Sequence, residues 1–181
     1  GLISRYSVAL ANEAYYRRAP RSRHGELQTI GAFFHPLDAI RNWNRVYGPG
    51  GFRQYQYVVP FGQEAAVRRS FELVSRARAA SFVTVLKRFG EGDPGLLSFP
   101  APGWTLALDV PARTGGLDGL LGALDRLVVD AGGRVYLAKD SRVPPGALAE
   151  MYPRLEEFRK LRAGLDPEGI LASDLSRRLR L

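Results

Sequence analysis

Apolar and polar residues alternate along several stretches of the chain, and such alternation is typical of β-strands. In FRQYQYVVP, Tyr55, Tyr57 and Val59 fall on one side of the predicted strand, opposite Gln54 and Gln56. This pattern, together with enrichment in β-forming residues, predicts strands over 27–34, 52–60, 81–89, 103–111 and 134–138.

In other stretches the apolar residues recur at helical spacing. This spacing predicts helices over 3–17, 63–79 and 116–131. The third helix is expected to end at Gly132-Gly133, because glycine readily adopts the left-handed conformation that follows many helices.

The remaining segments are less regular. Residues 37–51 are predicted to be a loop or a short helix. The C-terminal part is predicted to form helices broken at Pro153 and Pro167, and Asp166 precedes Pro167 as a helix cap would.

The order strand, helix, strand, strand, helix, strand between residues 52 and 138 predicts an α+β fold. We expect an antiparallel sheet with helices packed on one face, a split βαβ or ferredoxin-like arrangement, followed by a helical C-terminal segment. If the helices cover the Tyr55 side, the other face is half polar and is either solvent-exposed or the floor of a ligand site. That face would carry Gln54, Gln56, Val85, Lys87, Thr105 and Ala107.

Charge and composition add weak constraints. The 181 residues carry a formal net charge of +8, with a pI near 10.2, which suits an anionic partner such as a phosphate, a nucleic acid or a membrane surface, but equally a solvated basic surface. The chain has no cysteine, which excludes disulfides and thiolate sites. Its start at Gly1 rather than a methionine suggests a processed product or a piece of a longer protein. No apolar run is long enough to span a bilayer, so we expect no transmembrane segment.

Several kinds of site find little support in the sequence. His24 and His35 lack the spacing of metal ligands, so no metal site is expected. GPGGF at 48–52 leads into a strand rather than a helix, so it does not build a phosphate cradle. Lys87, among apolar strand neighbours, and Lys139, in YLAKDSR, could each reach solvent or contact an anion.

Long motifs across the chain resemble a known family. FFHPLDAIRNWNRVYG, FRQYQYVVP, LSFPAPGWTLALDVP, GGRVYLAKDSR, MYPRLEEFRKLR and DPEGILASDLSRRL are together similar to the C-terminal part of the decaprenylphosphoryl-β-D-ribose 2-oxidases. These are FAD-dependent oxidoreductases of the vanillyl-alcohol-oxidase type, which oxidise the ribose C2 hydroxyl of a polyprenylphosphoryl-ribose to a 2-keto sugar in actinobacterial cell-wall arabinan synthesis. The resemblance implies hydride transfer from that carbon to flavin N5.

The resemblance also implies roles for individual residues. Lys139 is expected to be catalytic, and Lys139 and Tyr136 are expected to lie beside the flavin. The substrate pocket would be lined by Phe34, Gln56, Val85, Lys87, Phe89, Thr105 and Ala107. Mycobacterial members carry cysteine where Ala107 stands and asparagine where Thr105 stands, so this chain offers no pocket thiol and a different hydrogen-bonding group.

The resemblance sets the expected organisation and partners. Residues 1–26 would link to an N-terminal FAD domain outside this chain, 27–150 would form the substrate-binding sheet domain, and 151–181 a C-terminal helical segment. The expected partners are that FAD domain, a polyprenyl-phosphate-sugar substrate and a reductase that completes the epimerisation. A peripheral contact with the cytoplasmic or periplasmic face of the cell membrane is also expected, and no nucleic acid.

Two alternatives stay open at this point. One is an FAD-dependent alditol or aldonolactone oxidase domain. The other is a basic RNA-binding α+β module in which the aromatic strand at 52–60 stacks bases.

Overall fold

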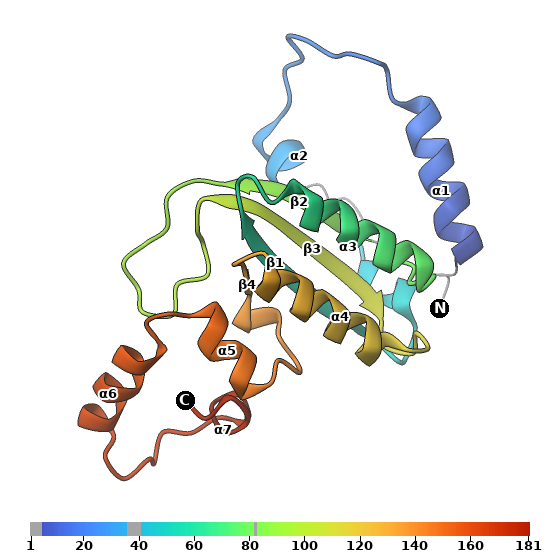
Figure 1. Ribbon diagram of the computed structural model, residues 1–181. Coiled ribbons are helices and arrows are strands. Elements are labelled where there is room, and N and C mark those ends of the chain that lie inside the picture. Colours follow the sequence, from blue (N-terminus) through green and yellow to red (C-terminus); the bar gives the residue numbers. More distant parts are fainter. Residues whose placement is uncertain (1–4, 36–40, 82) are drawn as a thin grey trace.

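A four-stranded antiparallel sheet with two covering helices forms the centre of the structure, a computed structural model that describes residues 5–35, 41–81 and 83–181 (Figure 1). The strand order is β2-β3-β1-β4. The elements in chain order are β1 (Phe52–Pro60), α3 (Glu64–Arg76), β2 (Thr84–Phe89), β3 (Gly103–Pro111), α4 (Leu117–Asp130) and β4 (Arg134–Val135). The predicted α+β fold and split βαβ order are therefore confirmed.

The two long strands, β1 and β3, pair over their whole length. Their register runs from Phe52 opposite Pro111 to Pro60 opposite Gly103. At the last pair, a Cβ on residue 103 would lie 2.1 Å from the carbonyl oxygen of Val59, so only glycine allows this approach. The long pairing fixes which side chains share a face, because a slip of one residue would exchange the two faces.

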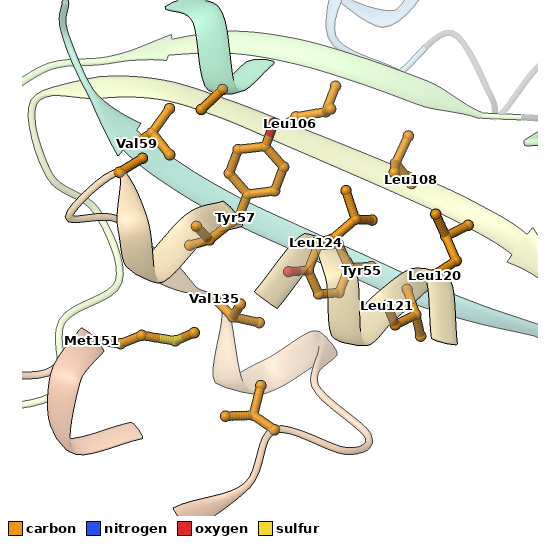
Figure 2. Close-up of a cluster of buried hydrophobic side chains, with 14 of the residues drawn as sticks. Tyr55, Tyr57, Val59, Leu106, Leu108, Leu120, Leu121, Leu124, Val135 and Met151 are labelled. Atoms are coloured by element: carbon orange, nitrogen blue, oxygen red, sulfur yellow. The ribbon is translucent and has the colours of Figure 1, made fainter. Parts of the chain in front are cut away.

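Helices α3 and α4 lie side by side across one face of the sheet (Figure 1). Beneath them lies the core, in which Tyr55 and Tyr57 of β1 pack with leucines of β3 and α4 (Figure 2). Burying one such apolar side chain contributes roughly 1.5–3 kcal/mol. The labelled core residues are Tyr55, Tyr57, Val59, Leu106, Leu108, Leu120, Leu121, Leu124, Val135 and Met151.

Polar atoms within this core have partners. The hydroxyl of Tyr57 donates to Ser70 Oγ of α3 at 2.7 Å, and Ser70 Oγ donates to the carbonyl oxygen of Ala66 at 3.0 Å. Because both tyrosine rings of β1 are buried under the helices, they are not on the open face where bases would stack in an RNA-binding module.

The end of α4 follows the sequence prediction. Gly132 adopts a φ of +65°, its N–H donates to the Val129 carbonyl, and the N–H of Gly133 donates to the Val128 carbonyl, each at 2.8 Å. These two hydrogen bonds form a Schellman motif, which supplies donors for carbonyl groups that have no partner within the helix at its C-terminal end. It turns the chain directly into β4.

The N-terminal part departs from the prediction. Residues 27–34 do not form a strand; instead α2 (Ile30–Phe34) begins after Thr29, whose Oγ1 accepts from Ala32 N at 3.2 Å. A threonine N-cap and the lack of a neighbouring strand among the described residues explain the error. Helix α1 (Arg5–Arg18) agrees with the predicted helix, of which residues 3 and 4 lie outside the described ranges. Figure 1 shows α1 and α2 apart from the helix layer on the sheet.

Two predicted strands are shorter in the structure. β2 begins at Thr84 rather than at 81, and β4 ends at Val135 rather than at 138. After β4 the chain forms the 3-10 turn η3 (Leu137–Lys139). The segment predicted as a loop or short helix contains the 3-10 helix η2 (Trp43–Tyr47), and residues 37–40 lie outside the described ranges.

The C-terminal segment is helical, as predicted, with breaks at both prolines. Its helices are α5 (Pro145–Met151), α6 (Leu155–Leu165) and α7 (Asp174–Leu179). The predicted cap at Asp166 is wrong: its carboxylate accepts from Ile170 N and Leu171 N and so closes a turn. The helix cap is Ser173, whose side chain accepts from Ser176 N at 3.1 Å.

Candidate functional site

The sheet face opposite α3 and α4 gathers the residues that the sequence singled out. In the register, Gln56 pairs with Ala107, and Ala107 pairs with Val85 on the other side. Thr105 pairs with Lys87, and Phe89 pairs with Gly103. Since directly paired residues of antiparallel strands project to the same face, six of the predicted site residues share one surface. We call this surface the polar face; it comprises Gln54, Gln56, Val85, Lys87, Phe89, Thr105, Ala107 and Asp109.

The centre of the polar face is buried rather than open. Gln56 is only 6% exposed and Thr105 only 1%, and the amide Nε2 of Gln56 donates to Thr105 Oγ1 at 3.0 Å. These two side chains therefore satisfy each other. Lys87, on the outer strand β2, is exposed and free to meet a ligand or solvent.

Aromatic rings border the polar face. Phe99, from the loop between β2 and β3, stacks on Tyr136 with ring centroids 4.5 Å apart and meets Phe89 edge-on at 5.7 Å. The N–H of Tyr136 donates to the carbonyl oxygen of Gln56 at 2.8 Å, which carries the sheet hydrogen bonds one residue beyond β4. Tyr136 is thus fixed beside the polar face by both its backbone and its ring.

Lys139 lies on the 3-10 turn that follows Tyr136, not on a strand end. Its N–H donates to the Tyr136 carbonyl at 3.0 Å, which closes the turn. A pocket of about 350 Å³ opens here between the start of β1 and this turn. Its lining residues are Phe52, Arg53, Gln54, Ala138, Lys139, Asp140 and Ser141.

The turn that carries Lys139 is anchored by its neighbour Asp140. One carboxylate oxygen of Asp140 accepts from the N–H groups of Arg142 and Val143, each at 2.8 Å, and the other accepts from Arg178 Nη2 of α7 at 2.6 Å. Arg142 in turn pairs with Asp125 of α4. Two elements therefore hold the turn in place through ion pairs.

Asp109 is a polar-face residue to which the sequence assigned no role. Gln54 Nε2 donates to Asp109 Oδ1 at 3.0 Å. Burial raises the pKa of the Asp109 carboxyl, while the bond from Gln54 and the positive charge of Lys139 lower it. The sequence did contain a signal: Asp109 continues the every-second-residue series Thr105, Ala107.

Phe34 is placed differently from the other predicted substrate residues. It lies on α2 rather than on a strand and is 67% exposed, with its ring against Phe33 at 4.9 Å. Its role as a pocket wall stays a prediction, as do the roles predicted for the polar-face residues.

The described residues also bear on two other kinds of site, a metal centre and a membrane span. Among the residues that the structure describes, no group of three or more histidine or acidic side chains is arranged to hold a metal ion. In the same part of the chain, no helix combines the length and apolar character needed to cross a membrane.

Comparison with known proteins shows that this chain is similar to an oxidase. The chain is 40% identical over all 181 of its residues to decaprenylphosphoryl-beta-D-ribose oxidase from Mycolicibacterium smegmatis, and it spans 39% of that protein. It is 44% identical over 180 residues to a Streptomyces coelicolor protein described as an uncharacterized protein in the mprA 5' region, of which it spans 48%. The chain thus covers less than half the length of either relative.

A family model adds a second link. The model for D-arabinono-1,4-lactone oxidase matches residues 117–179, from α4 through the Lys139 turn to α7. The resemblance predicted from the sequence motifs is therefore confirmed: along its whole length this chain is similar to a stretch that makes up 39% of a decaprenylphosphoryl-beta-D-ribose oxidase.

Proposed function

We propose that this chain is the substrate-binding part and C-terminal segment of an FAD-dependent oxidoreductase that oxidises the C2 hydroxyl of a polyprenylphosphoryl-ribose. The observation that carries the proposal is the 40% identity to the ribose oxidase over the whole chain. An FAD-linked oxidase is supported at the level of the family. The ribose and the polyprenyl phosphate follow from that relative, a decaprenylphosphoryl-beta-D-ribose oxidase, whereas the C2 position and a role in cell-wall synthesis follow from the resemblance of the sequence motifs.

The residues present fit a flavin beside the polar face. Lys139 and Tyr136 belong to the turn at the edge of this face, and an ammonium group suits the negative charge that develops on a reduced flavin ring. When bound, FAD supplies the acceptor for the hydride. We infer that Lys139 and Tyr136 lie against it and that an FAD-binding domain outside this chain holds most of it.

The polar face would bind and orient the sugar. The overall oxidation takes a hydride from the alcohol carbon and a proton from its hydroxyl oxygen, and leaves a carbonyl group. Exposed Lys87 is suited to the phosphate of the substrate as a cation, while the buried Gln56–Thr105 pair would support the floor of the site from beneath. Rigid placement on strands favours this role, because small errors in position strongly reduce hydride-transfer rates.

The test is flavin reduction in a protein that carries this chain together with an FAD-binding domain. Single-turnover reduction by a polyprenylphosphoryl-ribose should slow by roughly 100-fold or more in Lys139→Ala. Lys160→Ala is the matched control, because Lys160 is an exposed lysine of α6, and its rate should equal that of the wild type. An unchanged rate in Lys139→Ala would show that the role given to Lys139 is wrong.

A second candidate is an aldonolactone oxidase, which the family-model match over 117–179 favours. That match covers the Lys139 turn but none of the residues on β1, β2 and β3 that form the polar face. A product assay with both a lipid-linked ribose and an aldonolactone separates the two candidates: turnover of the lactone alone would exclude the ribose oxidase.

A further inference from the structure

Asp109 is a buried carboxyl group that the proposed function does not yet use. It lies on the polar face near the end of β3 and is 6% exposed. Its N–H donates to the carbonyl oxygen of Val83 at 3.1 Å and to Ser81 Oγ at 3.2 Å, so its backbone is held by the chain that leads into β2. A carboxyl group is rarely buried unless polar partners compensate it.

Its first partner is Gln54, directly opposite on β1. The amide Nε2 of Gln54 donates to Asp109 Oδ1 at 3.0 Å. An ionised carboxylate can only accept hydrogen bonds, so it fixes which end of the amide faces it. The NH₂ group of Gln54 is turned toward Asp109. The side-chain carbonyl oxygen of Gln54 therefore remains available to a ligand, and this side chain lines the 350 Å³ pocket.

Lys139 lines the same pocket as Gln54 and acts on Asp109 through its charge rather than through a direct contact. Its positive charge lowers the pKa of Asp109, as does the bond from Gln54, and both act against the larger effect of burial, which raises that pKa. A further titratable neighbour is Tyr47 of η2, whose pKa is raised by burial and by the charge of Asp109. Lys139 and Gln54 therefore both favour the ionised form of Asp109.

We propose that Asp109 is a positioning residue: it holds the Gln54 amide by its NH₂ group and offsets the charge of Lys139. The pocket then presents an amide oxygen and an ammonium group to the same ligand. A hydroxyl-bearing ligand such as a sugar satisfies both, because a hydroxyl donates to the amide oxygen while its own oxygen accepts from the ammonium group. Only the identity of this ligand rests on the proposed function.

The first experiment needs no flavin. The carboxyl carbon of Asp109 is followed by ¹³C NMR titration in this chain. Lys139→Met and Gln54→Leu should each raise the pKa of Asp109 relative to the wild type. Lys87→Met, which removes a lysine from the same face, should leave the titration unchanged. An Asp109 titration that does not move in Lys139→Met would overturn the proposal, and this surface-pocket variant is expected to fold normally.

The second experiment measures catalysis in a protein that also carries an FAD-binding domain. Asp109→Leu keeps the approximate size of the side chain but, unlike asparagine, has no oxygen that accepts from Gln54 Nε2, so the amide is released from its orientation. We expect kcat/KM for the sugar to fall by roughly 10–100-fold with FAD content unchanged. An unchanged kcat/KM would count against the proposal. If the wild type oxidises no sugar, the proposed function fails, whereas the NMR titration still decides the role of Asp109.

Discussion

The hydroxyl of Tyr55 donates a 2.9 Å hydrogen bond to Asp125, and so joins the central strand β1 to the covering helix α4. Asp125 also pairs with Arg142, next to the turn that carries Lys139. One carboxylate thus connects the sheet, the helix layer and the edge of the pocket. Its burial raises the pKa of Asp125, although the bonds from Tyr55 and Arg142 lower it.

This raised pKa predicts a pH-dependent stability. The folded protein binds the Asp125 proton more tightly than the unfolded chain does, because the ordinary pKa of an aspartate, which applies to the unfolded chain, is 3.8. The contribution of Asp125 to the free energy of unfolding is therefore fully present below pH 3.8. It is lost as the pH rises through the pKa of Asp125 in the folded protein. Urea unfolding at stepped pH should show the wild type losing stability relative to Asp125→Asn across this window. Tyr55→Phe removes a bond that lowers the pKa, so it should extend the loss to higher pH, and a trend of opposite sign would refute the assignment.

The ion pair between Asp140 and Arg178 should be needed to hold the Lys139 turn. Arg178→Met keeps much of the apolar stem but leaves the Asp140 carboxylate, whose side chain is almost fully buried, without its guanidinium. We expect a loss of about 2 kcal/mol in the free energy of unfolding, measured by urea denaturation. Arg177→Met is the neighbouring control: it removes an exposed pair with Asp174 and should cost less than about 1 kcal/mol. Equal effects of the two variants would contradict the structural role of Arg178.

Two glycines near α4 should respond in opposite ways to alanine. A Cβ on Gly133 would lie 2.4 Å from the carbonyl oxygen of Val58, a backbone atom that cannot move aside, so Gly133→Ala should destabilise by about 1–3 kcal/mol. Gly119 lies within α4, and an added Cβ would meet nothing within 4 Å apart from its chain neighbours and the backbone of its own helix, so Gly119→Ala should stabilise by roughly 0.5–1 kcal/mol. Thermal unfolding of both variants checks this, and a destabilising Gly119→Ala would contradict the open space around Gly119 on α4.

The parts of the fold that alternation specifies were predictable from the sequence. β1 and β3 match the predicted strands 52–60 and 103–111 because their two faces differ clearly in polarity. The segment 134–138 has no such alternation, and its length was decided by the hydrogen bonds available beside β1. At 27–34 the β-forming residues led to a wrong strand prediction. Composition does not reveal that Thr29 caps a helix, nor that no strand among the described residues lies beside this segment.

For the candidate site, too, one part could be predicted from the sequence and another part could not. The shared face of Gln56, Thr105 and Ala107 followed from counting residues along strands. The importance of Asp109 could not be predicted in this way, because the Lys139 turn follows β4 and only the folded arrangement brings that turn beside the start of β1. Sequence patterns report local periodicity, whereas the effect of the Lys139 charge on Asp109 depends on tertiary structure.

The hydrogen bonds around Asp140 have a consequence for motion. The amides of Arg142 and Val143 and the side chain of Arg178 all depend on one carboxylate, so the Lys139 turn cannot loosen without releasing α7. These elements should open together in hydrogen exchange, as a single cooperative unit at the edge of the pocket.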